Sequence, residues 1–370
     1  MESERVVKAS NRQLVLRLLY NRQQLTRKEI SDACGLSLPT VAQTIKELEE
    51  LGLTADAGHQ ASTGGRKPSV SSIVPDSRSS LGISVSKNDI RFALLNLGKE
   101  ICAKASFKVP FSDSPAYWED LRARTDSFLR YNHVDSSALL GVGFSFPGII
   151  NYRNRTLEFA PTLDADSVRL GKLNTYFGQN VLYDNDAVLA ARTEIWFKPQ
   201  KSPAVYLLLN RGVGGALISS TDCPFGARAG EFGHMVIEMG GKQCRCGNRG
   251  CLETYCSSAV LTESGEADSL EGFFSELKLG NENCARIWED YIAHLVTGVN
   301  NIRCIFDSDV ILGGEMSRFV EEYSDRLNDD LLKRSIFRDD QSYVRFSNYG
   351  EFDSAVGAAL LNIEKFIDSI

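Results

Sequence analysis

The sequence contains no apolar run approaching the ~18 residues that a membrane-spanning helix requires, which argues against an integral membrane protein. Its first ten residues, MESERVVKAS, are charged and lack the apolar segment of a secretory signal peptide. We therefore expect a cytoplasmic protein that has no membrane partner. The length of 370 residues is sufficient for two or three domains of ~100–200 residues each.

The cysteine count argues against a disulfide-stabilised protein, and the net charge argues against a protein that binds nucleic acid over its whole surface. Nine cysteines is an odd number in a long chain, so a disulfide framework is not expected. A net charge of −7 argues against a protein whose whole surface binds nucleic acid. However, residues 1–70 carry ten Lys and Arg against eight Asp and Glu, whereas the remainder carries 31 against 40. A mildly basic head on an acidic body is compatible with a small DNA-binding module attached to a second domain.

The first segment has the pattern of a helix-turn-helix. Thr26 and Glu29 form a capping box that predicts a helix start, and Gly35 is placed to end that short helix. Ser37 is a second N-cap candidate, and the apolar stripe of the helix that follows ends near Gly52. A short helix, a glycine-containing turn and a longer helix are typical of the DNA-binding motif. The alternative is an ordinary helical hairpin with a solvated polar face.

The second helix carries short polar side chains that we expect to face outward. Hydroxyl and amide groups of this size can reach phosphates and base edges in a major groove. The candidate DNA-binding residues on this helix are Ser37, Thr40, Gln43, Thr44 and Lys46.

Residues 53–73 read as a strand, a flexible turn and a second strand, which predicts the wing of a winged helix. Arg66 and Lys67, in the segment TGGRKPS, are candidate contacts to phosphates or to a minor groove. A solvated linker is the alternative. We expect a DNA-binding head at 1–70, a linker at 71–80 and a second domain at 81–370.

From residue 81 onward, apolar strand patterns alternate with helical patterns, which predicts an α/β architecture. The turn Lys87-Asn88-Asp89 lies between two apolar runs and predicts a β-hairpin. Asp184-Asn185-Asp186 follows one strand and precedes a helix. Ligands usually bind at such strand ends, so these polar side chains are expected to face a crevice.

His234 and three nearby cysteines form a candidate metal site. One imidazole and three thiolates, from His234, Cys244, Cys246 and Cys251, are a tetrahedral ligand set suited to zinc. Four protein ligands leave no open position for an activated water, so such a metal would be structural. Buried cysteines without a metal are the alternative, and Cys256 is expected in the core.

The spaced segment GEFGHMVIEMGGKQCRCGNRGCLETY resembles the signature of the ROK family, which contains repressors, open reading frames and sugar kinases. The similarity extends to DNDAVLAARTEIWF, FPGII and ILGGEMS, and covers roughly residues 81–370. Together with the preceding winged helix-turn-helix, it resembles the NagC/XylR-type repressor branch. The resemblance implies a two-lobed actin/hexokinase-like domain with a sugar in its cleft, and zinc on the matched His and Cys positions. It also implies that Asn185, Asp186, Glu231, His234 and Glu253 hold the sugar hydroxyls.

The resemblance also indicates whether the protein is a regulator or a kinase of the family. Kinases of the family carry a phosphate loop D-x-G-G-T-K, and the matching residues here, Ser84 to Asp89, read SVSKND. Asp89 would add negative charge where a cation meets phosphate. The second glycine loop, Gly212 to Gly215, is retained and is interpreted as a packing turn. Thr162 and Val188 also replace residues that are often Asn in the kinases.

We therefore expect a regulator without catalytic residues, not an enzyme. It would repress carbohydrate genes as a homodimer or homotetramer on double-stranded operator DNA, and a sugar or sugar phosphate would release it. One alternative is an ATP-dependent sugar kinase with an appended DNA-binding head. Another is an activator instead of a repressor.

Overall fold

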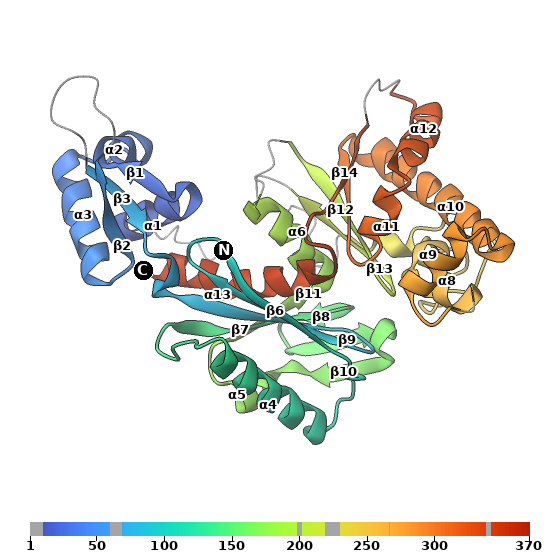
Figure 1. The fold of residues 1–370 in the computed structure, drawn as a ribbon, viewed down its shortest axis with the longest axis horizontal. Coiled ribbons are helices and arrows are strands. Elements are labelled where there is room, and N and C mark those ends of the chain that lie inside the picture. The colour runs from blue at the N-terminus through green and yellow to red at the C-terminus, as the bar shows by residue number, and fades with distance from the viewer. Residues whose placement is uncertain (1–9, 60–68, 198–201, 219–229, 266, 338–341) are drawn as a thin grey trace, which may run out of the picture.

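The computed structural model describes residues 10–59, 69–197, 202–218, 230–265, 267–337 and 342–370 (Figure 1). The described part of the N-terminal head contains helices α1 (Asn11–Arg22), α2 (Arg27–Cys34) and α3 (Leu38–Glu50), and strands β1 (Gln24–Thr26), β2 (Thr54–His59) and β3 (Ser69–Ile73). Strand β3 pairs antiparallel with both β1 and β2.

Local sequence signals set the helix boundaries of the head. Thr26 and Glu29 form the predicted capping box at the start of α2, and Gly35 ends that helix in the left-handed conformation with φ 66°. Ser37 caps α3 by accepting a hydrogen bond from the Thr40 N–H. The predicted helix-turn-helix, flanked by wing strands, is confirmed.

Two further expectations fall at the edge of the head. The predicted wing tip, with Arg66 and Lys67, lies outside the described residues. The segment expected to be a linker, 71–80, contains the end of β3, the short 3-10 helix η1 (Pro75–Ser77) and the start of the next strand.

The first lobe of the body is built on a five-stranded sheet of order β11-β7-β4-β5-β6. Its strands are β4 (Ser79–Val85), β5 (Ile90–Asn96), β6 (Ile101–Phe107), β7 (Leu139–Phe146) and β11 (Val181–Asn185). The antiparallel pair β4–β5 is the predicted hairpin. A small antiparallel sheet adjoins it and consists of β8 (Ile149–Asn151), β9 (Thr156–Ala160) and β10 (Ala165–Arg169). The 3-10 turn η2 (Pro161–Leu163) connects β9 to β10, and η3 (Leu170–Lys172) follows β10.

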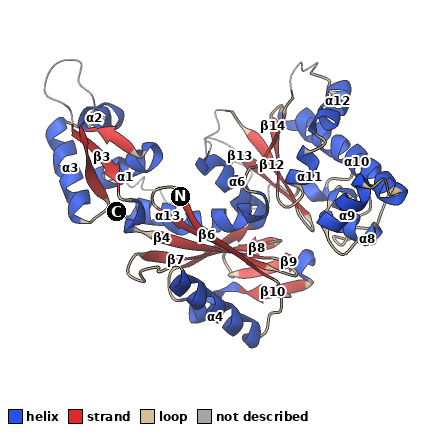
Figure 2. Ribbon diagram, viewed as in Figure 1, coloured by secondary structure: helices blue, strands red, loops and turns tan. Residues whose placement is uncertain are grey.

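Helices cover both faces of the five-stranded sheet (Figure 2). Helices α4 (Pro115–Tyr131) and α5 (Leu173–Phe177) lie on one face, and the C-terminal helix α13 (Asp353–Ser369) lies on the other. Helix α13 approaches the strands closely. A Cβ atom at Gly82 would lie 1.8 Å from the Ala355 carbonyl oxygen, and one at Gly143 would lie 1.9 Å from the Ala358 carbonyl oxygen. Glycines on the strands and alanines on the helix therefore permit this packing.

The second lobe is built on a four-stranded sheet of order β13-β12-β14-β15. Its strands are β12 (Ala204–Leu209), β13 (Val213–Ile218), β14 (Asp309–Gly313) and β15 (Val344–Phe346). Its helices are α7 (Glu253–Cys256), α8 (Ser258–Ser264), α9 (Leu270–Lys278), α10 (Glu282–Phe306), α11 (Ser317–Glu321) and α12 (Ser324–Arg334), with the 3-10 turns η4 (Phe232–His234) and η5 (Gly350–Phe352). Trp288 and Phe273, which are fully buried, anchor its core, and Cys256 is buried there as predicted.

Helix α6 (Asp186–Phe197) connects the lobes, because it packs against both α13 and β13. The predicted α/β fold, a winged helix-turn-helix followed by a two-lobed domain, is confirmed. None of the helices in the described ranges combines the length and the apolarity that crossing a membrane would require.

Candidate functional site

A cleft of about 640 Å³ lies between the two lobes. The first lobe contributes the turn after β4 and the end of β11, and the second contributes the turn after β12 and the segment around η4. All of the predicted sugar-binding residues line this cleft, namely Asn185, Asp186, Glu231, His234 and Glu253. The fold thus brings together side chains that are up to 68 positions apart in the sequence.

Three carboxyl groups share one end of the cleft. Burial raises the pKa of Asp186 to about 7, with smaller upward contributions from Glu231 and Glu253, although the Ala187 N–H donates to Asp186 Oδ1 at 2.9 Å and opposes the shift. Burial also raises the pKa of Glu231, and Glu253 adds to that shift while His234 opposes it. This end of the cleft therefore holds three neighbouring carboxyl groups, and burial disfavours the charged forms of Asp186 and Glu231.

Asn185 lines the cleft but makes its hydrogen bonds within the protein. Its Oδ1 accepts from the N–H groups of Ala187 at 2.9 Å and Val188 at 3.2 Å, and its Nδ2 donates to the Gly148 carbonyl at 3.0 Å. These contacts cap the start of α6 and hold the turn after β7. Asn185 Oδ1 is therefore already engaged by backbone groups of the protein.

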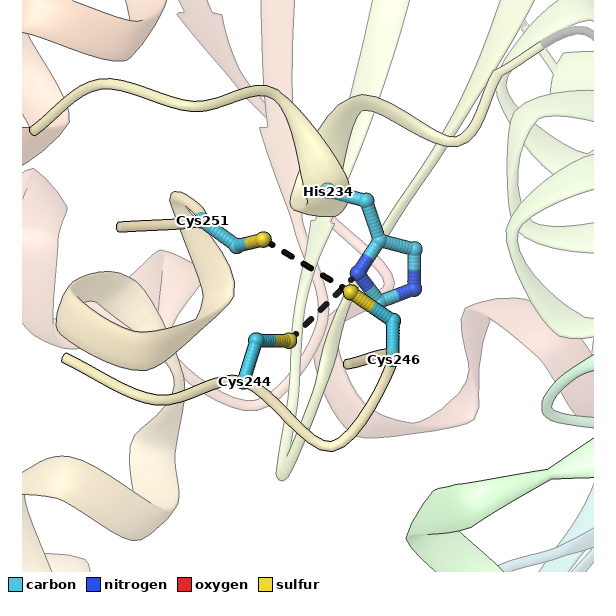
Figure 3. Close-up of side chains that lie close together, drawn as sticks. All are labelled: His234, Cys244, Cys246 and Cys251. Atoms are coloured by element: carbon cyan, nitrogen blue, oxygen red, sulfur yellow. Dashed lines mark hydrogen bonds between the residues drawn. The ribbon is translucent and has the colours of Figure 1, made fainter. Parts of the chain in front are cut away.

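The predicted metal ligands converge (Figure 3). The ligand atoms of His234, Cys244, Cys246 and Cys251 all lie within 4.8 Å of one another. His234 Nδ1 lies 3.7 Å from Cys244 Sγ, and Cys246 Sγ lies 3.7 Å from Cys251 Sγ. Zinc–sulfur bonds of about 2.3 Å in a tetrahedron place the sulfurs about 3.8 Å apart, so both the donor set and the spacing fit a tetrahedral metal ion.

Backbone turns shape the cysteine loop. The Cys244 N–H donates to the Asn248 carbonyl at 2.8 Å, and the Gly247 N–H donates back to the Cys244 carbonyl at 3.1 Å. Gly250 has φ 81°, and a Cβ atom there would lie 1.7 Å from the Glu238 carbonyl oxygen. Glycine is therefore required at 250 for the loop to close.

The cysteine loop contacts both the cleft and the opposite lobe. The Cys244 thiol donates to Glu253 Oε1 at 3.7 Å, and Glu253 Oε2 accepts from the Val213 N–H at 3.2 Å. Arg245 reaches across to the first lobe, where its guanidinium donates to the Pro161 carbonyl at 3.0 Å. A change in this loop would therefore reach Glu253 and the contact between the lobes.

An ion cluster occupies the part of the cleft next to the atypical loop Ser84 to Asp89. The Arg91 guanidinium is nearly buried and contacts Asp89 at 3.0 Å, Glu351 at 3.2 Å and Glu315 at 3.9 Å. Glu315 follows β14 and Glu351 lies in η5, so the cluster connects the lobes. Arg91 was not predicted from the sequence, where its one signal is a charge inside the apolar strand IRFALL.

One prediction on the recognition helix is wrong. Thr44 is only 4% exposed, and its hydroxyl donates to the Thr40 carbonyl at 2.9 Å, so it does not face outward as expected. Ser37, Gln43 and Lys46 are exposed and Thr40 is partly exposed. The exposed Leu38, which begins α3, was not predicted, although an apolar side chain there could contact a thymine methyl group.

Two helices extend from the cleft to the head. Helix α6 starts with Asp186, and in its last turn Trp196 Nε1 donates to the Tyr20 hydroxyl of α1. Helix α13 begins beside the cleft, and at its other end Ile370 accepts a hydrogen bond from Ser10 Oγ at 3.2 Å, next to an ion pair between Asp368 and Arg17. Both helices therefore contact the cleft and the head.

A winged helix-turn-helix joined to a two-lobed domain with a polar cleft defines a DNA-binding protein built on an actin/hexokinase-like fold. The chain belongs to the ROK family, which its residues 80–365 match, and residues 10–53 match the winged helix-turn-helix DNA-binding domain.

Relatives of similar length support this assignment. The chain is 27% identical over 361 residues to the xylose repressor of Caldicellulosiruptor bescii, which covers 90% of each chain. It is 25% identical over 265 residues to the N-acetylglucosamine repressor of Escherichia coli O157:H7, which covers 70% of this chain and 65% of the relative.

Solved structures show the same fold. A ROK family transcriptional regulator, described as a homolog of the E. coli MLC protein, has a TM-score of 0.77 at 19% identity and covers 97% of this chain and 96% of that one. A ROK family glucokinase from Streptomyces griseus, in complex with glucose and AMPPNP, has a TM-score of 0.61 at 22% identity and covers 76% and 98%. At these identities the similarity establishes the fold alone.

Proposed function

We propose that this protein is a sugar-responsive transcriptional repressor of carbohydrate genes. Its head would bind operator DNA, and a sugar in the cleft would weaken that binding. The observation that carries this proposal is the pair of helices α6 and α13, because each contacts the cleft at one end and α1 of the head at the other. The names of two relatives, a xylose repressor and an N-acetylglucosamine repressor, support the same function.

The cleft has the chemistry expected for binding sugar hydroxyls. Carboxylates such as those of Asp186, Glu231 and Glu253 form charge-assisted hydrogen bonds with hydroxyl donors. His234 turns Nδ1 toward Cys244, which leaves Nε2 as a further donor or acceptor for a ligand. We propose that these four side chains bind the sugar directly and that Asn185 contributes by holding the start of α6.

Sugar binding would be coupled to the head through a shift between the lobes. Closure on a sugar would move Asp186 and with it the rest of α6, whose last turn contacts Tyr20. Helix α6 crosses α13 closely, since a Cβ atom at Gly357 would lie 1.9 Å from the Leu189 carbonyl oxygen. The two helices would therefore move together. Such coupling is typically worth ~1–3 kcal/mol between two sites.

We propose that Ser37, Thr40, Gln43 and Lys46 of α3 contact operator DNA, together with Arg66 and Lys67 of the wing. Two heads are needed for a palindromic operator, so the active form would be a homodimer or homotetramer. A repressor of this kind acts in the cytoplasm.

We propose that His234, Cys244, Cys246 and Cys251 bind a structural zinc ion. When bound, zinc would fix the thiolates in one arrangement and supply no reactive position. The residues of the cysteine loop would themselves act by positioning the side chains that contact the sugar. The Cys244 thiol lies beside Glu253, and His234 lies at the cleft, so a fixed loop would hold both sugar contacts in place.

We propose that the protein does not transfer phosphate. The loop Ser84 to Asp89 lacks the acidic residue and the glycines of the kinase pattern, and Arg91 with its three carboxylate partners lies beside that loop. A coupled ATPase assay across a sugar panel tests this point, and robust turnover would establish the kinase instead.

The central experiment measures operator affinity with and without sugar. Binding of the full-length protein to labelled operator fragments would be followed by fluorescence anisotropy while sugars are titrated. A sugar that binds the protein and weakens operator binding about 5–150-fold is the expected result for such coupling. A sugar that binds without changing operator affinity would contradict the proposed regulation.

A further inference from the structure

We infer that Gln43 reads an A·T base pair in the major groove of the operator and that Glu47 sets the orientation of the Gln43 amide. These roles rest on the proposed function and add to it the base that is recognised. Helix α3 lies on the side of the head that faces away from the body (Figure 1), and Gln43 is exposed on it. Base pairs are distinguished by the hydrogen bonds that side chains make with their major-groove edges.

The other polar side chains proposed for α3 cannot present a donor and an acceptor side by side. The Ser37 hydroxyl accepts from the Thr40 N–H at 3.3 Å, and the two hydroxyls share a hydrogen bond at 2.8 Å. Lys46 carries donors only, and its ammonium lies 3.9 Å from Glu50. An amide has both kinds of group, so Gln43 is the one of these four residues that can make a bidentate contact of mixed polarity with a base.

The hydrogen bond between Gln43 and Glu47 fixes which end of the amide is which. Gln43 Nε2 donates to Glu47 Oε1 at 3.0 Å, one helical turn further along α3. A carboxylate only accepts hydrogen bonds, so it must face the amide nitrogen and not the amide oxygen. The second Nε2 proton and Oε1 of Gln43 stay available, and the described residues place no donor on that oxygen.

Arg12 of α1 supports Glu47 from the neighbouring helix. Its Nε lies 3.9 Å from Glu47 Oε2, and the side chains of Arg12, Gln43 and Glu47 line one groove between α1 and α3. The guanidinium offsets the negative charge that Glu47 would bring toward the phosphates. The Gln43 amide is thus oriented before DNA is present, which lowers the ordering cost of a two-bond contact.

This orientation of the amide selects adenine among the four bases. Adenine presents the N7 acceptor and the N6 amino donor next to each other in the major groove, which matches one amide N–H and one amide oxygen. Guanine presents two acceptors there, so Gln43 Oε1 would face another oxygen, and each pyrimidine presents a single polar group. A good bidentate contact discriminates against a wrong base by roughly five- to hundredfold.

Selection of binding sites from a random duplex library by the full-length protein tests the base. We expect each selected half-site to contain an A·T pair whose preference falls roughly five- to hundredfold in Gln43→Ala, while the other positions persist. Replacing that adenine by 7-deazaadenine, which lacks N7, should weaken binding of the wild-type protein and leave Gln43→Ala unaffected. A G·C pair at the Gln43-dependent position, or no such position, would overturn the inference while leaving operator binding intact. If the protein selects no sequence, the proposed function fails as well.

Two variants of Glu47 separate positioning of the amide from support of the fold. Glu47→Ala should lower the preference for that A·T pair about tenfold, while binding to a duplex without the site stays equal or tightens because a negative charge has left the DNA face. Glu47→Gln keeps an acceptor oxygen and should retain most of the preference. Glu50→Ala, at an exposed glutamate of the same helix, is the control matched for charge.

Two outcomes would overturn the positioning role of Glu47. One is an undiminished A·T preference in Glu47→Ala. The other is the loss of preference at a C·G pair in that variant, because a carboxylate that accepts from the cytosine N4 amino group would make Glu47 itself the reader of a base.

Discussion

Trp196, in the last turn of α6, donates a hydrogen bond to the hydroxyl of Tyr20 in the DNA-binding head. Both side chains are buried, their ring centroids are 6.2 Å apart, and the Lys99 ammonium lies 5.0 Å from the Tyr20 ring. This contact joins α6, which starts in the cleft, to α1 of the DNA-binding head. If the protein transmits sugar binding to DNA, this pair lies on the route.

Tyr20→Phe should weaken the coupling between sugar and operator. The change leaves the Trp196 N–H buried without its acceptor, at a cost of about 1–3 kcal/mol, and it loosens the contact between α6 and α1. We expect the sugar-dependent change in operator affinity to fall several-fold while sugar affinity is retained. Anisotropy and calorimetry measure the two quantities. Tyr131→Phe, at an exposed tyrosine, is the matched control. Equal coupling in Tyr20→Phe and wild-type protein would remove this contact from the route.

Cys246→Ser should lose the metal and then the sugar response. Serine is a poor zinc ligand, and the three remaining ligands would hold the loop less firmly. Metal content measured by mass spectrometry should fall to background, and sugar should no longer shift the melting temperature. Cys102→Ser, at an exposed cysteine outside the cluster, should keep both properties. Full sugar response in a metal-free Cys246→Ser protein would show that the cluster and the cleft are independent.

Asp186 and Asp353 should each make a contribution to the free energy of unfolding that decreases as pH rises from about 4 to about 7. Burial raises the pKa of Asp186 from its ordinary value of 3.8 to about 7, so the folded state retains a proton there that the unfolded state releases. Asp353, buried beneath the cleft, has its pKa raised to about 7 by the same cause and adds to the slope. Asp186→Asn should flatten the slope in part, as judged by urea denaturation at several pH values. An unchanged slope would mean that Asp186 is already ionised at low pH.

Operator binding should depend on Gln43 and not on the Thr44 hydroxyl. The double change Gln43→Ala with Arg66→Ala removes an exposed amide and a wing cation, and should abolish the operator shift while the melting temperature stays near that of wild type. Thr44→Val removes only a hydroxyl that bonds within α3, so operator affinity should stay within about twofold. The opposite ranking of these variants in a gel-shift assay would place the DNA-binding face elsewhere.

The sequence predicted features that depend on neighbours along the chain. The capping box at Thr26, the cap at Ser37 and the His and Cys set at 234–251 each follow from short-range spacing. Thr44 was predicted wrongly because its polarity was given more weight than its position. Val41, Thr44, Ile45 and Leu48 follow the i, i+3, i+4, i+7 spacing of one buried stripe.

Long-range contacts could not be predicted in this way. Arg91 and Glu351 are 260 positions apart, and Trp196 and Tyr20 are 176 apart. Such pairs depend on how the lobes and the head pack, and short-range periodicity carries no information about that packing. Strand-end reasoning alone predicted that Asn185 and Asp186 face a crevice, whereas the assignment of all five residues to one sugar site came from the family resemblance.

The hairpin β4–β5 has a consequence for protein engineering and for evolution. Ser84, at the position of the missing kinase aspartate, is directly opposite Arg91 in the register of the two strands. An aspartate introduced at 84 would therefore face a guanidinium, and residues opposite each other on two strands interact directly. It would form a cross-strand salt bridge instead of a free metal-binding carboxylate. A free carboxylate at 84 would require Arg91 to change as well, which would leave three acidic partners without their cation. A single substitution at 84 would therefore not build a metal-binding carboxylate at this position.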